Sequence, residues 1–480
     1  MRSRLLTLAG AAALAAFTQL SPHAAHAQTA PTPAATQLPY PAYGTPAPGI
    51  AVQRPQAGIP QAVSLQQAIQ IAAAKSPVLA IARAQLKQAH APLSLAHTAI
   101  FPNISGTASS THSNRSGGGQ SNNGSFNPGG SFTTNDLSAN QRQLIYDGGR
   151  VIAQIHTARA NYGAATSTYE RSFQTVAFNV ATAYYTALQA QQATFVAQQV
   201  VHQNEVQEAL VNAQLRAGTA SRVDLATAQL PVAQAKVTLV RAQGAELQAD
   251  AAFANALGLD ADTLVRPVND SAANSITTLL QAPPVSYDAA VKRALLLRPD
   301  YLAAQQTVMA QQYNLQFAKS GMYPSLNGNA SYGTASTLAN GTDYRPSNSV
   351  GVTLSIPLFD QGITRAQTEQ ASGQLDQATA QLESARLNVE LNVQQALVNF
   401  VSAQAAVTQA QAELSKAQEI LRATQAQYRA GVTTLPLLLN AQVGLTQAQT
   451  DELNAVYGLR QAEQSYLYAL GEIAMNPGTP

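Results

Sequence analysis

The sequence predicts a mixed, mainly α-helical fold built from two tandem copies of one unit. Three observations predict it: motifs that recur at fixed spacings, two very long segments without proline, and short segments in which apolar and small polar residues alternate. The repeating unit is about 200 residues long, far above the 20–50 residues of solenoid repeats. We therefore expect two large, similar halves rather than an array of small modules.

The recurring motifs lie at two spacings. The motif at 101–106, Phe-Pro-Asn-Ile-Ser-Gly, returns 222 residues later at 323–328 as Tyr-Pro-Ser-Leu-Asn-Gly. Farther along, the spacing is 213 residues, as between the Arg-Ala-Gly motifs at 216–218 and 429–431. The halves therefore differ in length at one loop, which is 9 residues shorter in the second half. The expected boundaries are a first repeat at 61–258, a connector at 259–283, a second repeat at 284–471 and a C-terminal tail at 472–480.

The N-terminus has the features of a secretory signal peptide over 1–27. Arg2 and Arg4 precede an apolar run, and Ala-His-Ala follows at 25–27. Residues 28–60 carry eight prolines and are expected to form a disordered leader. We therefore expect the mature protein to leave the cytoplasm.

Composition excludes several classes of function. The chain has no cysteine, so it can form neither a disulfide nor a thiolate metal site. Its net charge of +2 argues against a nucleic-acid partner, and charged residues make up 11% of the chain, against roughly 25% in ordinary soluble domains. No phosphate-binding loop or cluster of metal ligands is present, so we predict no cofactor, no metal, no catalytic residue and no enzymatic activity.

The first helices can be placed from capping and breaking residues. Ser64 and Gln67 have the spacing of a capping box, which predicts a helix beginning there. Pro77 interrupts this helix, and a second is expected over 78–99, ending before Phe101-Pro102.

Strand-like segments follow in both halves. They cover 103–146 in the first half, interrupted at 115–130, and 325–336 and 349–359 in the second. The segment at 349–359 alternates between apolar residues and Ser, Gly or Thr. This pattern fits any half-buried sheet, and it also fits a barrel strand with one face toward lipid and one toward a wet lumen.

Two very long helices come next. Between Arg150 and Ala217 there is no proline and one glycine over 68 residues, which predicts a helix roughly 100 Å long. The segment 364–430 is its repeat, and return helices are expected over 224–258 and 436–471. The short helix before the strands and the return helix together nearly match one long helix, so they could pair with it end to end.

The second long helix carries a regular heptad. Its positions are Val389, Val393, Ala396, Phe400, Ala403, Val407, Ala410, Leu414, Ala417, Leu421, Thr424 and Tyr428. Large and small residues alternate along this stripe, as knobs-into-holes packing requires. In the first half the same register holds from Val176 to Val201 and is interrupted at Asn204 and Glu208. A solvated amphipathic helix in a bundle is the alternative, and the length of the helix argues against it.

At this point the chain resembles the TolC-like outer-membrane efflux family over 64–471. The resemblance rests on the two strand motifs above, on Leu-Ile-Tyr-Asp-Gly-Gly at 144–149 and Pro-Leu-Phe-Asp-Gln-Gly at 357–362, and on the Arg-Ala-Gly tips. It implies three protomers, each giving four strands to a twelve-stranded barrel in the outer membrane of a Gram-negative type envelope. A long α-helical barrel would continue this β-barrel through the periplasm. The residues alone show that four strands cannot close a barrel, so copies must associate.

The resemblance also implies a function and partners. The protein would be a trimeric outer-membrane channel, the exit duct of a tripartite efflux or type I secretion system that passively exports small molecules or proteins. Its partners would be two further copies, a periplasmic adaptor protein, an inner-membrane pump that supplies the energy, and outer-membrane lipid.

The resemblance places an aperture at the helix tips farthest from the strands. By position, Asp224 and Tyr428 match partners that hold such a mouth shut, and we predict a hydrogen bond between them, with Arg429 beside it. The alternative role of Asp224 is to cap the return helix. Leu437 and Asn440 stand where relatives carry acidic residues, so we expect a neutral or apolar mouth of weak cation selectivity.

The adaptor is expected to dock at the exposed turns of the tips. The candidate positions are Gly218, Thr219, Gly431 and Val432. The alternative role of the two glycines is to cap the helices. Arg142, beside the end of a strand, either faces the lumen or is a solvated charge.

A different reading of the sequence is a periplasmic coiled-coil adaptor or scaffold protein of an envelope transport complex. That class is also secreted and rich in heptads. It predicts one helical hairpin flanked by compact β-domains, rather than two hairpins interleaved with two pairs of strands.

Overall fold

The computed structural model describes residues 61–115, 130–268, 280, 286–337 and 345–473. The expected signal peptide at 1–27 and leader at 28–60 lie outside these ranges. In the described ranges, no helix combines the length and the apolar character needed to cross a membrane.

The elements of the first repeat follow the predicted order. They are β1 (Gln61–Val63), α1 (Leu65–Lys75), α2 (Pro77–Thr98), β2 (Asn103–Arg115), β3 (Gly130–Tyr146), α3 (Arg150–Arg216), α4 (Arg222–Ala256) and β4 (Val265–Pro267). The predicted capping box is present at the start of α1, where Ser64 and Gln67 bond to each other's backbone.

The second repeat has the same order. Its elements are α6 (Tyr287–Leu297), α7 (Pro299–Lys319), the short 3-10 helix η1 (Ser320–Met322), β5 (Ser325–Thr337), β6 (Arg345–Ser355), α8 (Ile363–Arg429) and α9 (Leu435–Leu470). Both α3 and α8 contain 67 residues. Two hairpins interleaved with two strand pairs contradict the prediction of an adaptor with a single hairpin.

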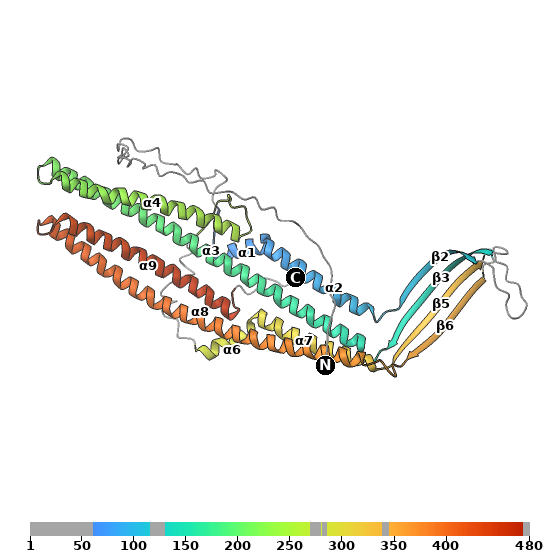
Figure 1. The fold of residues 1–480 in the computed structure, drawn as a ribbon. Coiled ribbons are helices and arrows are strands. Elements are labelled where there is room, and N and C mark those ends of the chain that lie inside the picture. The colour runs from blue at the N-terminus through green and yellow to red at the C-terminus, as the bar shows by residue number, and fades with distance from the viewer. Residues whose placement is uncertain (1–60, 116–129, 269–279, 281–285, 338–344, 474–480) are drawn as a thin grey trace, which may run out of the picture. The chain divides into compact units, whose positions relative to one another are not determined.

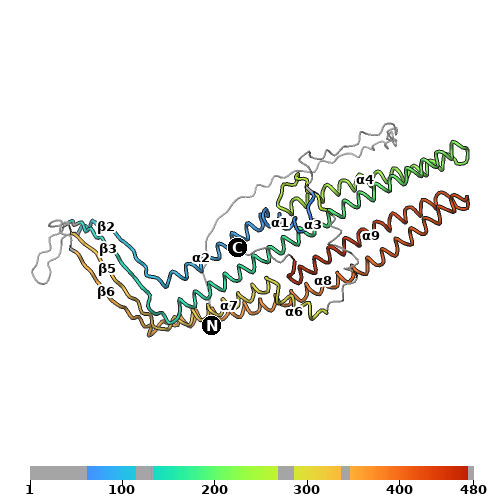
Figure 2. Tube along the Cα trace, turned by 180° about the vertical axis from the view of Figure 1, so that it is seen from behind, coloured from blue at the N-terminus to red at the C-terminus, as the bar shows by residue number. Residues whose placement is uncertain are grey.

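These elements form a layer four elements wide (Figures 1 and 2). The strands form one antiparallel sheet in the order β2-β3-β5-β6. Beyond the sheet, α3 packs against α2 and α7, and α7 packs against α8. Toward the hairpin tips, α3 packs against α4 and α9, and α9 against α8. One edge of the layer is therefore β2, α2 and α4, and the other is β6 and α8.

The predicted end-to-end arrangement is confirmed, because α2 and α4 both pack along α3. The heptad is confirmed as well, since all its positions in α8 are buried or half-buried. In the first repeat the stripe continues past Asn204 with a shifted register, through the buried Gln207 and Val211. The buried stripe therefore does not end at Glu208 but continues along α3, through Gln207 one residue earlier and Val211 three residues later.

Each long helix begins at an aspartate that follows a strand. Asp147 Oδ2 accepts from the amide of Val151 at 2.7 Å, and Asp360 Oδ2 accepts from the amide of Thr364 at 2.8 Å. A carboxylate here satisfies the free N–H groups of the first turn and faces the positive end of the helix. The hydrogen bonds from Thr364 and Gly362 lower the pKa of Asp360.

Each repeat has its own core near the middle of the chain. In the first, Leu79, Tyr184, Phe253 and Leu257 pack beneath the two-stranded parallel sheet of β1 and β4. The second core is formed by α6, α8 and α9. Its buried members are Ala290, Val291, Ala294, Val389, Val393, Ala396, Tyr466, Ala469 and Leu470.

The last strand differs from the prediction. β6 covers 345–355 rather than 349–359. Pro346 can be accommodated because β6 is an edge strand, and Pro357 lies just beyond its end. Val350, Val352 and Leu354 are exposed on one face, as the alternation predicts.

Candidate functional site at the hairpin tips

Both hairpins turn at a glycine with a left-handed backbone. Gly218 has φ +75° and Gly431 has φ +72°. In each turn, the residue after the glycine donates its amide to a carbonyl five residues earlier, from Thr219 to Gln214 and from Val432 to Gln427, both at 2.9 Å. This is the glycine cap that ends many helices, so both glycines have the structural role considered above.

The return helices begin differently in the two hairpins. Ser221 caps α4, and its amide and hydroxyl both donate to Asp224 Oδ2 at 2.8 Å. The hydrogen bonds from Ser221 lower the pKa of Asp224. Thr434 precedes α9 without a side-chain capping bond, and Pro436 lies in the first turn, where its missing N–H costs nothing.

An apolar cluster joins the two tips to each other. Val211 of α3, Ala228 of α4 and Leu435 of α9 are buried together. The ring of Tyr428 packs on this cluster and also on a second one, formed by Leu421, Leu438 and Leu445. Tyr428 therefore lies where the two hairpins meet.

Within one chain, Tyr428 and Asp224 have other partners than each other. The Tyr428 hydroxyl donates to Gln214 Oε1 at 3.3 Å, and Asp224 is bound to Ser221 in the first turn of α4. The physical reason is local. Ser221 holds the carboxylate against its own helix end, while Gln214 extends from α3 toward the tyrosine.

The other predicted aperture residues lie at the surface. Arg429, Leu437 and Asn440 are exposed. The predicted docking positions Gly218, Thr219 and Gly431 are exposed too, and Val432 is 77% exposed. The structure thus brings Tyr428 alone of the predicted aperture set into the contact between hairpins.

Sequence reasoning missed the glutamines of α3 and α9. Gln207 and Gln214 are seven residues apart, which places them on one face of α3. That spacing, continuing the apolar stripe to the tip, was the available signal. Gln207 is buried, and its Nε2 has no hydrogen-bond partner among the described residues; the same holds for Gln442 Oε1 of α9.

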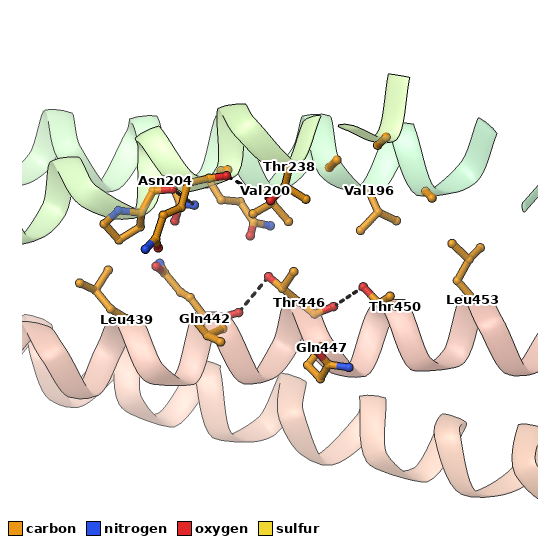
Figure 3. A pocket seen from close by; sticks show the side chains of 18 residues that line it. Val196, Val200, Asn204, Thr238, Leu439, Gln442, Thr446, Gln447, Thr450 and Leu453 are labelled. Carbon is orange, nitrogen blue, oxygen red and sulfur yellow. Dashed lines mark hydrogen bonds between the residues drawn. The ribbon is translucent and has the colours of Figure 1, made fainter. Parts of the chain in front are cut away.

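Between the tips and the middle of the chain, the two hairpins do not pack completely against each other. A cavity of about 330 Å³ lies between α3, α4 and α9. Figure 3 shows Val200 and Asn204 on one side of it, with Gln442, Thr446 and Thr450 on the other. A smaller cavity of about 290 Å³ lies nearer the tip and is lined by both Gln207 and Gln442. The contact between hairpins is therefore loosely packed, and Arg429 lines its smaller cavity.

The tips carry no recognisable catalytic chemistry. In the described part of the chain, no group of three His, Cys, Asp or Glu side chains could hold a metal ion. The pairings of polar groups at the tips are caps and neutral hydrogen bonds.

The fold is shared with solved membrane proteins. A membrane protein from Pseudomonas aeruginosa superposes with a TM-score of 0.72 at 21% sequence identity, covering 85% of this chain and 93% of that one. The outer membrane protein VceC from Vibrio cholerae gives a TM-score of 0.70 at 19% identity, covering 85% and 96%. These likenesses place the chain in the α-helical barrel fold class with repeated halves.

Sequence comparison gives the family. The family model described as outer membrane efflux protein matches residues 68–259 and 290–472, more than half of the chain. The chain therefore belongs to the outer membrane efflux protein family, and it is a protein of the Gram-negative outer membrane that extends into the periplasm. It is 26% identical over 245 residues to the outer membrane efflux protein BepC of Brucella suis biovar 1, a match that spans 51% of either chain.

Proposed function

We propose that three copies of this chain close into one channel, which serves as the exit duct of a tripartite efflux or type I secretion system. Small molecules or proteins would pass through it passively. A periplasmic adaptor would dock at the tips, and an inner-membrane pump would supply the energy. The observation that carries the proposal is a pair of matching free edges.

The sheet has two open edges. In the described residues, β2 pairs only with β3, and β6 pairs only with β5. An open edge leaves a row of unpaired N–H and C=O groups. In a membrane these groups must find protein partners, because lipid offers none. Four strands are too few for closure, so the missing neighbours of β2 and β6 must come from other chains.

The helices have matching edges of their own. α4 exposes an apolar heptad stripe at its free edge, and α8 does the same. The exposed α4 stripe is Val223, Ala226, Leu230, Ala233, Val237 and Val240. The exposed α8 stripe is Leu387, Leu391, Val398, Val401, Ala405 and Ala412, with the polar Gln394 and Thr408 at the two intervening heptad positions. Apolar positions that repeat in steps of three and four are the signature of a coiled-coil seam.

The internal repeat indicates which helix surfaces these two stripes would contact. Shifting by the 213-residue spacing converts α3 into α8 and α4 into α9. The exposed α8 residues Leu391 and Val401 correspond to Phe178 and Leu188 of α3, and Leu188 is buried. Phe178 stacks on Tyr468 of α9, with ring centroids 4.8 Å apart. The contact of α3 with α9 inside one chain is therefore a template for the contact of α8 with α4 of a second copy.

The exposed tips support the adaptor as a partner. Both turns present backbone and small side chains to solvent, and Val432 adds an apolar surface. Arg216, Arg222 and Asp224 flank the first turn, and Arg429 precedes the second. Recognition there would depend on these charges as well as on shape and backbone hydrogen bonds.

The template gives a direct test of the seam. Within one chain, Gln189 of α3 donates to Asn454 of α9 at 2.8 Å. The repeat spacing maps this pair onto Ser402 of α8 and Arg241 of α4, both exposed and on opposite edges of the layer. Because the chain has no cysteine, the double variant Ser402→Cys/Arg241→Cys has only these two thiols.

A short bis-maleimide should convert this double variant into covalent dimers and then trimers in outer membranes. Each single variant gives no ladder. The matched control Val407→Cys/Arg241→Cys should stay monomeric, because Val407 is buried against its own return helix. A double variant that reacts with a monofunctional maleimide but remains monomeric with the cross-linker would overturn the proposal.

A further inference from the structure

The four-stranded sheet has one apolar face and one polar face. The register aligns Val352 with Gly328, and Val350 with Ala330, on the apolar face. The polar face consists mainly of Ser, Thr and Asn. Its β3 members include Asp136, Ser138, Asn140 and Arg142, and its β5 members include Ser325, Asn327, Asn329 and Ser331. In a lipid bilayer the apolar face lies outward, so the polar face lines the lumen.

Charge is scarce in the part of this polar face whose side chains the structure describes. Where the structure describes side chains there, Asp136 and Arg142 are the only charged residues. They are six residues apart on β3, which is about 20 Å along a strand. That separation exceeds the Debye length of about 8 Å in physiological salt, so a solute meets the two charges separately.

Arg142 has no partner in its own row. Its backbone pairs with Asn103 on one side and Asn329 on the other, and Gly351 follows on β6. None of the hydrogen bonds and ion pairs of the described residues uses its exposed guanidinium. Gly351 leaves open space, since a Cβ there would meet no atom within 4 Å.

The guanidinium borders a hollow where the strands meet the helices. This hollow has a volume of about 530 Å³ and is lined by Arg142 together with Ser325, Asn327 and Ser355. Hydroxyl and amide donors beside an unpaired arginine are the groups that bind carboxylate and phosphate.

Two further charges line the same hollow, and they nearly cancel. Asp147 is engaged at the start of α3, where it accepts the amides of Gly149 and Val151. The Arg150 guanidinium lies 4.5 Å from the centre of the Phe317 ring. With Arg142 the hollow holds two positive charges and one negative, so one positive charge remains in each chain.

We propose that this hollow binds anionic groups of solutes in transit, carboxylates or phosphates, with Arg142 as its principal ligand. The inference rests on the proposed function, because association of three chains turns one arginine into a ring of three. A ring of arginines is a device of anion-conducting pores. Three unit charges about 8 Å from an ion, screened by physiological salt, favour an anion by roughly two- to threefold.

The repeat supplies a sharp set of variants. The residue 213 positions after Arg142 is Ser355, which lines the same hollow. Arg142→Ser therefore gives the first repeat the side chain of the second. The double variant Arg142→Ser/Ser355→Arg moves the charge to the equivalent strand, and Arg142→Lys keeps it in place.

The experiment measures reversal potentials of the full-length protein in planar bilayers under a KCl gradient, and block by citrate, a tricarboxylate. Because the same potential favours chloride and disfavours potassium, Arg142→Ser should lower the chloride-to-potassium permeability ratio by about four- to ninefold relative to the unmodified protein, and it should weaken citrate block. Arg142→Lys and the double variant should retain the ratio of the unmodified protein.

Channels of Arg142→Ser that conduct with unchanged ion preference and unchanged citrate block would overturn this inference while leaving the proposed duct intact. Failure of the unmodified protein to assemble and conduct at all would overturn the proposed function instead. The two failures are therefore distinguishable in one set of recordings.

Discussion

The two repeats differ most where they meet near the middle of the chain. In the second repeat, Arg298 and Asp300 flank the proline that starts α7, and the Arg298 side chain is 3% exposed. The positions 222 residues earlier are Ser76 and Val78. The first repeat thus has a small hydroxyl and an apolar side chain where the second has an ion pair between a buried arginine and a half-buried aspartate.

The ion pair belongs to a larger polar junction that ties α9 to α3. Arg298 donates to both oxygens of Asp300, at 3.1 and 2.6 Å. Arg171 of α3 lies 3.8 Å from the Asp300 carboxylate and 3.8 Å above the ring of Tyr468. Gln174 donates to the carbonyl of Gly471 at 2.8 Å.

The equivalent residues of α8 have neither the charged group nor the side-chain amide that form this junction. Arg171 and Gln174 correspond to Ser384 and Leu387, which are exposed at the free edge. The contact of α3 with α9 inside one chain is therefore stabilised by charge and hydrogen bonds, whereas the contact proposed between α8 and α4 of two chains is mainly apolar. The contact inside one chain includes an ion pair, whereas the seam proposed between chains includes the exposed Arg241.

The largest expected effect comes from breaking the ion pair. Asp300→Ala leaves the Arg298 charge buried without its partner, which should cost about 3 kcal/mol of unfolding free energy. Val78→Ala is the matched control in the first repeat. Val78 is 55% exposed, so this change should stay within about 0.5 kcal/mol. Denaturant unfolding followed by circular dichroism measures both, and equal effects of the two variants would contradict the comparison.

The same pair gives a pH dependence of known sign. Burial raises the pKa of Asp300, but the hydrogen bond and charge of Arg298 and the charge of Arg171 outweigh it, so the pKa is lowered overall. The stabilisation is therefore fully present above the ordinary aspartate value of about 3.9, and it is lost as pH falls through the lower folded value. The unfolding midpoints of the unmodified protein and Asp300→Asn should differ at pH 6 and begin to approach each other only as pH falls below about 4.

The glycines that end the return helices should give an intermediate effect. Gly258 has φ +74°, and a Cβ there would lie 2.8 Å from the carbonyl oxygen of Lys75. At its repeat equivalent, Gly471, the nearest backbone atoms are 3.1 Å away. Gly218 has a similar φ of +75° with nothing within 4 Å, so Gly218→Ala reports backbone strain alone, about 1 kcal/mol.

Alanine should therefore destabilise in the order Gly258, Gly471, Gly218, as measured by thermal unfolding. An equal cost at all three positions would show that the close approach of the return helix to α1 adds nothing.

The smallest expected effect is at the tips. Tyr428→Phe removes the hydrogen bond to Gln214, worth about 0.5–1.5 kcal/mol in each chain. If the contact between hairpins restrains the mouth, open probability in planar bilayers should rise, by about two- to tenfold for one such bond. Asp224→Asn is the control, because its carboxylate serves only the first turn of α4. An increase with Asp224→Asn but not with Tyr428→Phe would restore the latch predicted from the sequence.

The sequence predicts the long helices and their ends closely, because few residues there break a helix. The 68-residue span after Arg150 and the Arg-Ala-Gly turns correspond to the observed bounds within a residue or two. The heptad of α8 is equally local information. Such features depend on neighbours in the chain, so spacing alone reveals them.

What could not be predicted depends on contacts between distant segments. The partner of Tyr428 is decided by how far two hairpins approach each other, and Gln214 lies 214 residues earlier in the chain. The alternative role of Asp224, capping the start of α4, depends only on nearby residues. In the structure Asp224 forms a capping box with Ser221 there. The junction of Arg171 with Asp300 joins the two repeats, and no spacing within either repeat indicates it.

The most direct test of the whole account is the native mass of the detergent-extracted protein. We expect the mass of an assembly of three chains, held by the open edges β2 and β6 and by the stripes on α4 and α8. A single chain that stays monomeric at every protein concentration, in a detergent that preserves its helical content, would contradict it.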